Sequence, residues 1–213
     1  MQNEIKSMIE GSIGTKRMCL ELVPQIEKAA HLVINTLKNN KKIILAGNGG
    51  SSTQAAHISA EFVGRYKIER RGLPAIALTT DLAVITAIGN DYGFDTIFER
   101  QIEALGNEGD VFIALSTSGN SKNIINAVEK AKKMNVHVIG LLGNDGGKLR
   151  KLLAIDMASE SHEPHMSLLA SSHADTSSVE IIVPSSNIPR IQEAHLMILH
   201  IICELVEKEL FGK

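Results

Sequence analysis

Residues 42–63 read KIILAGNGGSSTQAAHISAEFV, and this stretch decides the fold. It begins with an apolar run, Lys42–Ala46, that fits a strand buried on both faces. A glycine-rich turn follows and leads into a helical pattern over Ser52–Val63. A buried strand that passes through glycines into a helix is typical of a parallel α/β unit.

The same alternation of short apolar runs and helical patterns continues along the chain. The later strands are predicted at Pro74–Leu78, Asp110–Leu115, Val136–Leu142 and Val179–Val183. Helices are predicted at Phe94–Leu105, Ser121–Met134 and Pro189–Leu210. Apolar runs separated by helices indicate a parallel sheet covered on both faces, so we predict one α/β sandwich without an internal repeat.

Two segments fall outside this alternation. Residues 1–40 have helical spacing only, and Pro24 is expected at the start of a second helix. Residues 159–178, SESHEPHMSLLASSHADTSS, have no sustained period. The histidines there invite a metal site, but their irregular spacing and the lack of Cys favour a solvated loop; they are His162, His165 and His173. We therefore expect one domain over 1–213, with a helical extension at 1–40 and a loop insertion at 159–178.

Composition and charge exclude several classes of protein. The chain has 213 residues, 44% of them apolar, with 22 Lys and Arg against 24 Asp and Glu. A net charge of -2 and 3% aromatic residues argue against nucleic-acid binding by bulk electrostatics or base stacking. No secretory signal or membrane-spanning apolar run is evident, and two cysteines are too few for a disulfide scaffold. These features predict a cytoplasmic protein with no membrane segment.

Two turns at the ends of predicted strands are candidates for ligand binding, because ligands of open parallel sheets collect there. In Gly47–Ser52 the glycines let a ligand approach main-chain N–H groups, and Ser51 or Ser52 can cap the next helix. This turn lacks the ending of a nucleotide P-loop. Residues Ser116–Ser121 place four hydroxyl side chains at a helix N-terminus, which favours an anion. We predict that this second turn holds a phosphate group.

Polar and ionisable residues on two helices form a second group of candidates. His57 and Glu61 are i and i+4 neighbours, a pair that can hold a metal ion or combine a ligand with a general base. The last helix adds Gln192, Glu193, His195 and His200. Spacing alone does not decide between His195 and His200, although an imidazole within an apolar stretch needs a partner.

Four ordered segments carry a resemblance to a known family. They are AGNGGSSTQAAHISAEFVGRY (46–66), TAIGNDYGFDTIFERQIEALGNEGDV (86–111), STSGNS (116–121) and PRIQEAHLMILHIICELVEKE (189–209). Together they resemble the phosphoheptose isomerases of the sugar-isomerase (SIS) family, over nearly the whole chain outside 159–178. The resemblance implies a three-layer αβα sandwich with a nucleotide-binding-like parallel sheet. It also implies a homotetramer whose active sites draw residues from neighbouring subunits.

The resemblance implies a reaction and a set of site residues. The reaction converts sedoheptulose 7-phosphate to D-glycero-D-manno-heptose 7-phosphate, the first step toward the heptoses of lipopolysaccharide or related glycans. The family's zinc ligands, for one ion per subunit, fall on His57, Glu61, Gln192 and His200. Its substrate contacts fall on Asn48, Gly49, Gly50, Glu61, Asn90, Asp91, Ser116, Thr117, Ser118, Ser121 and Gln192. The chain departs from the family at Pro189, where an acidic residue is common.

The chemistry explains these residue types. A ketose becomes an aldose when a proton leaves the carbon beside the carbonyl and returns to its neighbour through a cis-enediol. This needs proton-transfer groups and a means of stabilising the oxyanion. Glu61 and His200 are the candidates for proton transfer, and Zn²⁺ suits the stabilising role. Phosphate binding at 116–121 fixes the register of the substrate.

Two other classes of function share this fold. The first is a non-enzymatic tetramer that binds the replication initiator, which the N-terminal MQNEIKSMIEGSI and the ending LFGK resemble in part. That branch lacks the histidine of the last helix, whereas His200 is present here. The second is the phosphosugar-sensing module of a transcription factor, for which the chain has no residues left to form a helix-turn-helix domain.

Overall fold

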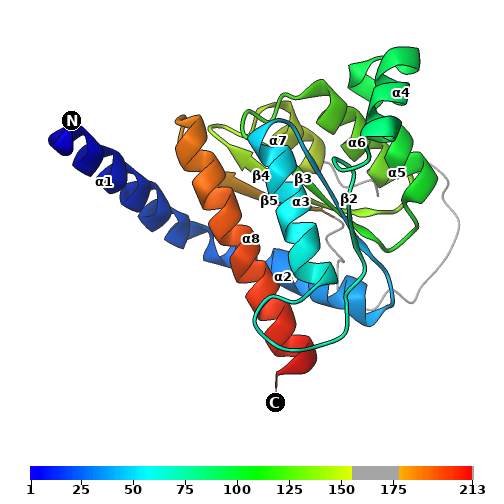
Figure 1. Cartoon of the computed structure of the whole chain (residues 1–213), viewed down its shortest axis with the longest axis horizontal. Helices are drawn as coiled ribbons and strands as arrows, with labels where there is room; N and C mark the ends of the chain where they lie inside the picture. The colour runs from blue at the N-terminus through cyan, green and yellow to red at the C-terminus, as the bar shows by residue number, and fades with distance from the viewer. Residues whose placement is uncertain (155–177, 213) are drawn as a thin grey trace, which may run out of the picture.

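In a computed structural model, which describes residues 1–154 and 178–212, the chain forms a layered α/β fold (Figure 1). The strands in these residues are β1 (Ile43–Gly47), β2 (Ala75–Ala77), β3 (Val111–Ser116), β4 (His137–Gly143) and β5 (Ser178–Val183). The α-helices are α1 (Gln2–Met18), α2 (Val23–Lys38), α3 (Gly50–Val63), α4 (Leu82–Tyr92), α5 (Glu99–Leu105), α6 (Lys122–Lys133), α7 (Gly147–Ala154) and α8 (Ile188–Phe211). Short 3-10 turns lie at η1 (Cys19–Leu22) and η2 (Phe94–Thr96).

The strands of the described residues form one parallel sheet in the order β2-β1-β3-β4-β5. Successive side chains of a strand point to opposite faces, and here both faces are covered. Leu45 and Ile113 pack into one core, while Ile44 and Phe112 pack into the other. The predicted three-layer αβα sandwich with a central parallel sheet is therefore confirmed.

The two cores define which helices cover which face. The core on one face contains side chains of α2, α3 and α8, and the core on the other face contains side chains of α5, α6 and α7. Because β1 and β3 are neighbours whose following helices cover opposite faces, the chain reverses its winding direction between them. A parallel sheet opens a crevice for ligands at such a point.

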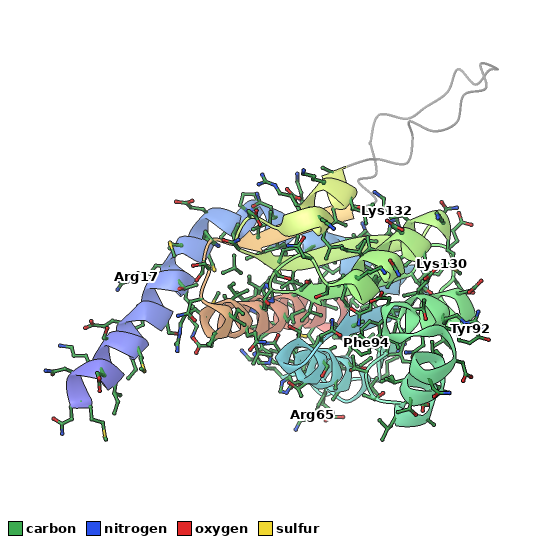
Figure 2. All side chains as sticks on the ribbon, turned by 90° about the horizontal axis from the view of Figure 1, so that it is seen from above. Arg17, Arg65, Tyr92, Phe94, Lys130 and Lys132 are labelled. Atoms are coloured by element: carbon green, nitrogen blue, oxygen red, sulfur yellow. The ribbon has the colours of Figure 1, made fainter. Side chains whose placement is uncertain are left out.

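The N-terminal extension is helical, as predicted, and much of it extends beyond the sandwich (Figure 2). Pro24 lies in the first turn of α2, where its missing N–H costs no hydrogen bond. Helix α2 buries its apolar face on the sheet, whereas α1 leaves large apolar side chains in solvent. Those on α1 include Ile5, Met8, Ile9 and Met18.

Several local predictions differ from the structure. The segment Phe94–Leu105 is not one helix, because a 3-10 turn at Phe94–Thr96 precedes α5. Neither Ser51 nor Ser52 caps α3: Gly49 is the N-cap residue, and the Ser52 hydroxyl donates to its carbonyl oxygen. Helices α4 and α7 lie where no helix was predicted.

Two further predictions concern the 159–178 segment and a membrane span. All the histidines of the Ser159–Ser178 segment lie outside the described residues. Among the helices of the described residues, none is long and apolar enough to cross a lipid bilayer.

Candidate active site

The turns after β1 and β3 meet at the crevice. Asn48, just after β1, and Asn123, in the first turn of α6, exchange two side-chain amide hydrogen bonds of 2.9 Å. This pair joins the glycine-rich turn after β1 to the start of α6, the helix that follows the serine-rich turn. Sequence reasoning missed Asn123, although a buried amide on the apolar face of α6 was a local signal for such a partner.

The glycine-rich turn brings α8 close to the start of α3. Gly49 has a φ of +53°, in the left-handed region that glycine adopts without strain. A Cβ atom on Gly50 would lie 2.7 Å from Nε2 of Gln192, so a side chain at position 50 would displace the Gln192 amide. Gln54 also donates to the Gln192 carbonyl oxygen (2.7 Å). The predicted substrate contacts Gly49, Gly50 and Gln192 therefore lie together.

The serine-rich turn presents hydroxyl groups at the N-terminus of α6. Ser116 is buried, and its hydroxyl lies 3.3 Å from that of Ser121. Ser121 is the N-cap residue, but its side chain makes no capping hydrogen bond to α6. Thr117 is partly exposed, and Ser118 is exposed. Uncapped N–H groups at a helix N-terminus favour an anion, so the geometry fits the predicted phosphate site.

The helices α3 and α8 bring three predicted residues together. Nε2 of His57 lies 3.1 Å from Nε2 of His200 and 3.1 Å from Oε1 of Glu61. One ligand atom from each residue lies within 4.8 Å of the others. We call these three residues the ligand cluster. His57 and Glu61 therefore contact each other, as their i, i+4 spacing predicts. The histidine of α8 that lies beside them is His200 rather than His195.

The donor atoms of the ligand cluster fit a small divalent metal ion. Ligands at about 2.0–2.1 Å from a tetrahedral Zn²⁺ lie about 3.3 Å apart, close to the 3.1 Å separations of these side-chain atoms. Two imidazoles and a carboxylate are also donors that zinc accepts. Among the described residues, no other group of three His, Cys, Asp or Glu side chains converges in this way.

The environment of the cluster favours the uncharged form of His200. Partial burial lowers the pKa of His200 below its usual range, and the neighbouring His57 lowers it further, against an opposite effect of Glu61. A neutral imidazole has a free lone pair for a metal ion or a proton. The Tyr66 ring stacks on His200, with centroids 5.5 Å apart and an interplanar angle of 26°.

His195 has a different environment. It is fully buried, and its Nε2 lies 2.8 Å from the Leu142 carbonyl oxygen. Burial lowers the pKa of His195 to about 4, so it is a neutral core residue at physiological pH. The choice that spacing left open is therefore decided by packing.

Asn90 and Asp91 are not brought to the cluster. They lie in the last turn of α4, both are exposed, and the Asn90 amide donates to the Asp91 carboxylate (2.8 Å). Helix α4 packs mainly against η2. Pro189 lies in the first turn of α8, after an Asn187 side chain that caps the helix, so it is compatible with the helix start.

The model of the SIS domain family matches residues 15–143, so this layered α/β fold is that of a SIS-domain protein. The phosphoheptose isomerase of Sulfurimonas denitrificans is 46% identical to this chain, over 100% of the chain and 98% of that protein. The chain therefore belongs to the phosphoheptose isomerase family.

Solved structures agree with this assignment. The phosphoheptose isomerase of Neisseria gonorrhoeae superposes with a TM-score of 0.82 at 38% identity, covering 97% of this chain and 98% of that one. The enzyme of Francisella tularensis gives a TM-score of 0.83 at 38% identity with the same coverage. These comparisons give no support to the alternative of a partner of the replication initiator.

Proposed function

We propose that this chain is an aldose–ketose isomerase that converts sedoheptulose 7-phosphate to D-glycero-D-manno-heptose 7-phosphate. The observation that carries the proposal is the convergence of His57, Glu61 and His200. It occurs in a chain that matches phosphoheptose isomerases over its full length.

The proton transfers are assigned to Glu61 and His200. Oε1 of Glu61 faces His57 at 3.1 Å, which leaves its second carboxylate oxygen to take or give a proton. Burial lowers the pKa of His200, which favours the neutral imidazole that can accept a proton. Because Glu61 and His200 are also assigned to the metal ion, one of them exchanges that role or a bound water carries the proton. The two groups come from different helices and can reach different ends of the two-carbon unit that exchanges protons.

We assign one zinc ion per subunit to His57, Glu61, Gln192 and His200. The ligand-cluster distances support three of these ligands, and the similarity of the last helix to the family supports Gln192. When bound, zinc polarises carbonyl and hydroxyl oxygens and so stabilises an oxyanion.

The substrate is assigned to the crevice between the ligand cluster and the two turns. Its phosphate group is bound by hydroxyl groups at the N-terminus of α6, from Ser116, Thr117, Ser118 and Ser121. Its sugar chain is contacted by Asn48, Gly49, Gly50, Glu61, Asn90, Asp91 and Gln192. Binding the remote phosphate supplies energy that lowers the barrier at the reacting carbons.

The working form is proposed to be a homotetramer of single-domain chains spanning 1–213. Exposed apolar side chains support this proposal: Leu82 of α4 is 72% exposed, Phe94 of η2 is 61% exposed and Met8 of α1 is 63% exposed. A neighbouring copy that covered α4 would also fix Asn90 and Asp91. We place the enzyme in the cytoplasm, where its product enters heptose synthesis for lipopolysaccharide or related glycans.

The direct test is incubation of the purified chain with sedoheptulose 7-phosphate and detection of the aldose product by NMR. We expect conversion in the parent and almost none in Glu61→Gln. Absence of product from a folded, zinc-supplied parent would refute the proposed reaction.

A further inference from the structure

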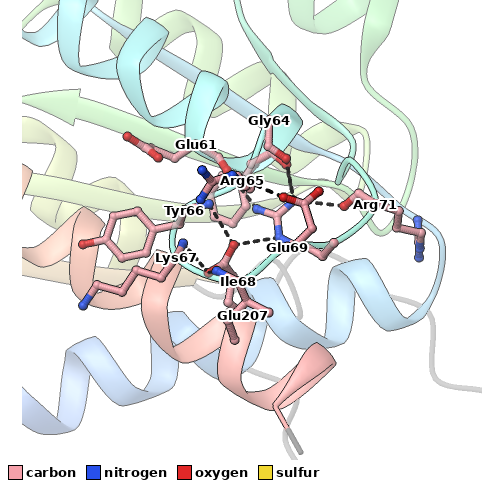
Figure 3. A network of polar contacts seen from close by, with 11 residues as sticks. Glu61, Gly64, Arg65, Tyr66, Lys67, Ile68, Glu69, Arg71 and Glu207 are labelled. Carbon is pink, nitrogen blue, oxygen red and sulfur yellow. Dashed lines mark hydrogen bonds and ion pairs between the residues drawn. The ribbon is translucent and has the colours of Figure 1, made fainter.

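Glu207, near the end of α8, accepts four hydrogen bonds although it is only 2% exposed. Its Oε1 accepts from the Tyr66 N–H and from Nε of Arg70, both at 2.8 Å. Its Oε2 accepts from the N–H groups of Lys67 (2.8 Å) and Ile68 (3.0 Å). Figure 3 shows the chain after α3 turning around this carboxylate.

Arg70 extends the network to the end of α3. Its side chain is 1% exposed. Its Nη2 donates to the Glu61 carbonyl oxygen (2.8 Å), and its Nη1 donates to those of Phe62 (2.9 Å) and Gly64 (3.2 Å). The last carbonyl groups of a helix have no partner within the helix. This one guanidinium supplies hydrogen bonds to three carbonyl groups at the end of α3 and, through Nε, ties them to Glu207 of α8.

The Glu207 carboxylate is therefore connected both to Glu61 on α3 and to the ring that contacts His200 on α8. Through Arg70 it holds the backbone of Glu61, and through the Tyr66 N–H it holds the ring that stacks on His200. Stability alone does not require an ion pair here, because well-packed apolar residues in place of a buried pair are often equally stable. What the pair supplies is a fixed spacing between two helices.

The surroundings of Glu207 favour its ionised carboxylate although the side chain is buried. Burial alone would raise its pKa, but the N–H groups of Lys67, Tyr66 and Ile68, together with Arg70, bring the pKa below its usual range. An ionised carboxylate accepts from several donors at once, which a neutral side chain does not.

We propose that Glu207 is a positioning residue for the ligand cluster, fixing α3 and the 66–68 turn to α8 so that the three ligand atoms converge. Glu207 is not among the residues assigned to the metal ion or the substrate, and it acts through Arg70 and Tyr66. This inference rests on the proposed function for the role of the cluster in catalysis, but not for its capacity to bind a metal ion.

The test compares Glu207→Gln with Glu209→Gln in the full-length chain. Glu209 lies on the same helix and makes an ion pair of 2.7 Å with Lys38 at the surface, so its substitution removes the same charge outside the network. Zinc affinity is measured by competition with a chromophoric chelator, using Zn²⁺ alone. Loss of a side chain that orients metal ligands costs about 10- to 100-fold in affinity or activity, and we expect a loss of that size for Glu207→Gln.

Kinetics provide a second measurement. We expect kcat of Glu207→Gln to fall while KM for the sugar phosphate stays near the parental value. The serine-rich turn, which is proposed to bind the phosphate, is not part of the hydrogen-bond network around Glu207. Glu209→Gln should match the parent in zinc affinity and in kcat. A purely structural role would lower the unfolding temperature of Glu207→Gln but leave the zinc affinity of its folded form unchanged, and that result would overturn the proposal.

Two milder variants decide the question if Glu207→Gln does not fold. Glu207→Asp keeps the charge but withdraws it by one methylene, and Tyr66→Leu keeps every hydrogen bond to Glu207 but removes the ring from His200. Weakened zinc binding in both supports the proposal, and parental affinity in either overturns it. A parent that binds zinc without isomerising sugar phosphate refutes the proposed function alone. A parent that binds no zinc overturns this inference, while its isomerase activity is judged separately.

Discussion

Helix α3 packs against β1, β2 and α8 and places His57 and Glu61 beside His200, whereas α4, which carries Asn90 and Asp91, has no buried residue. The three converging ligand atoms of the first region come from one chain. The second is an apolar helix whose side chains, such as Leu82, face solvent. Metal binding should therefore be a property of the single chain, whereas full substrate binding should depend on what covers α4.

The largest expected effect lies in the fixed region. Glu61→Gln and His200→Asn keep the size of each side chain but remove a base, and general acid–base catalysis is worth about 10²–10⁴-fold. We expect kcat to fall by at least that factor, measured with sedoheptulose 7-phosphate at saturation. Loss of a metal ligand would deepen the fall.

The controls for this prediction are the zinc content and the oligomeric mass of each variant. Zinc content and oligomeric mass are measured in the same samples, because an altered cluster could also change either of them. Variants that stay metal-loaded and as active as the parent would show that the catalytic assignment is wrong.

A second prediction concerns the folding of α8. The pKa of His195 is lowered by burial from 6.5 to about 4. The unfolded chain therefore binds more protons between these values, and stability from this group is present above pH 6.5 and lost as the pH falls toward 4. At about 1.4 kcal/mol per pKa unit, the free energy of unfolding should fall by about 3 kcal/mol through His195.

The matched variant for this measurement is His195→Gln, which keeps a side-chain N–H for the Leu142 carbonyl oxygen but does not titrate in this range. Urea unfolding is recorded above pH 6.5 and near pH 4 at one protein concentration. The parent should lose more stability than the variant. Equal losses would mean that His195 is not a buried neutral group.

A third prediction tests the serine-rich turn between β3 and α6. Ser118→Ala or Ser121→Ala removes one hydroxyl from the proposed phosphate site, and a hydrogen bond to a charged group contributes about 1.5–3 kcal/mol. We expect KM to rise by about 10- to 150-fold, with kcat and the unfolding temperature little changed. A parental KM in both variants would place the phosphate elsewhere.

How much of this was predictable depends on whether the signal was local. Apolar runs predicted all of the described strands, since a parallel strand is buried on both faces. The spacing of His57 and Glu61 predicted their contact, because residues four apart share a helix face. His200 needed the family resemblance, because nothing in the spacing of α8 distinguishes it from His195.

Other features have no local signature. The Glu207–Arg70 pair joins residues 137 positions apart, and only tertiary packing brings them together. Helix α4 was missed because its sequence, LAVITAIGNDY, combines β-branched residues with Gly89, which weaken a helical pattern. Its start was nevertheless marked: Asp81 caps the helix by accepting the Val84 N–H at 3.0 Å.

The smallest expected effect on the isolated chain is also the sharpest test of α4. Leu82 is 72% exposed, and substitution of such a side chain usually changes stability by no more than about 0.5 kcal/mol. Leu82→Ser should therefore leave the fold of one chain intact. If α4 is covered by another copy in the proposed tetramer, however, the same change removes apolar area from that contact. The oligomeric mass, followed by light scattering over a dilution series, should then fall at a higher protein concentration than in the parent. KM should rise because the neighbouring copy no longer fixes Asn90 and Asp91.

Zinc affinity should not change, because the ligand cluster lies within one chain. A parent that is monomeric throughout the series, or a variant whose zinc affinity falls together with its assembly, would contradict the division between the two regions.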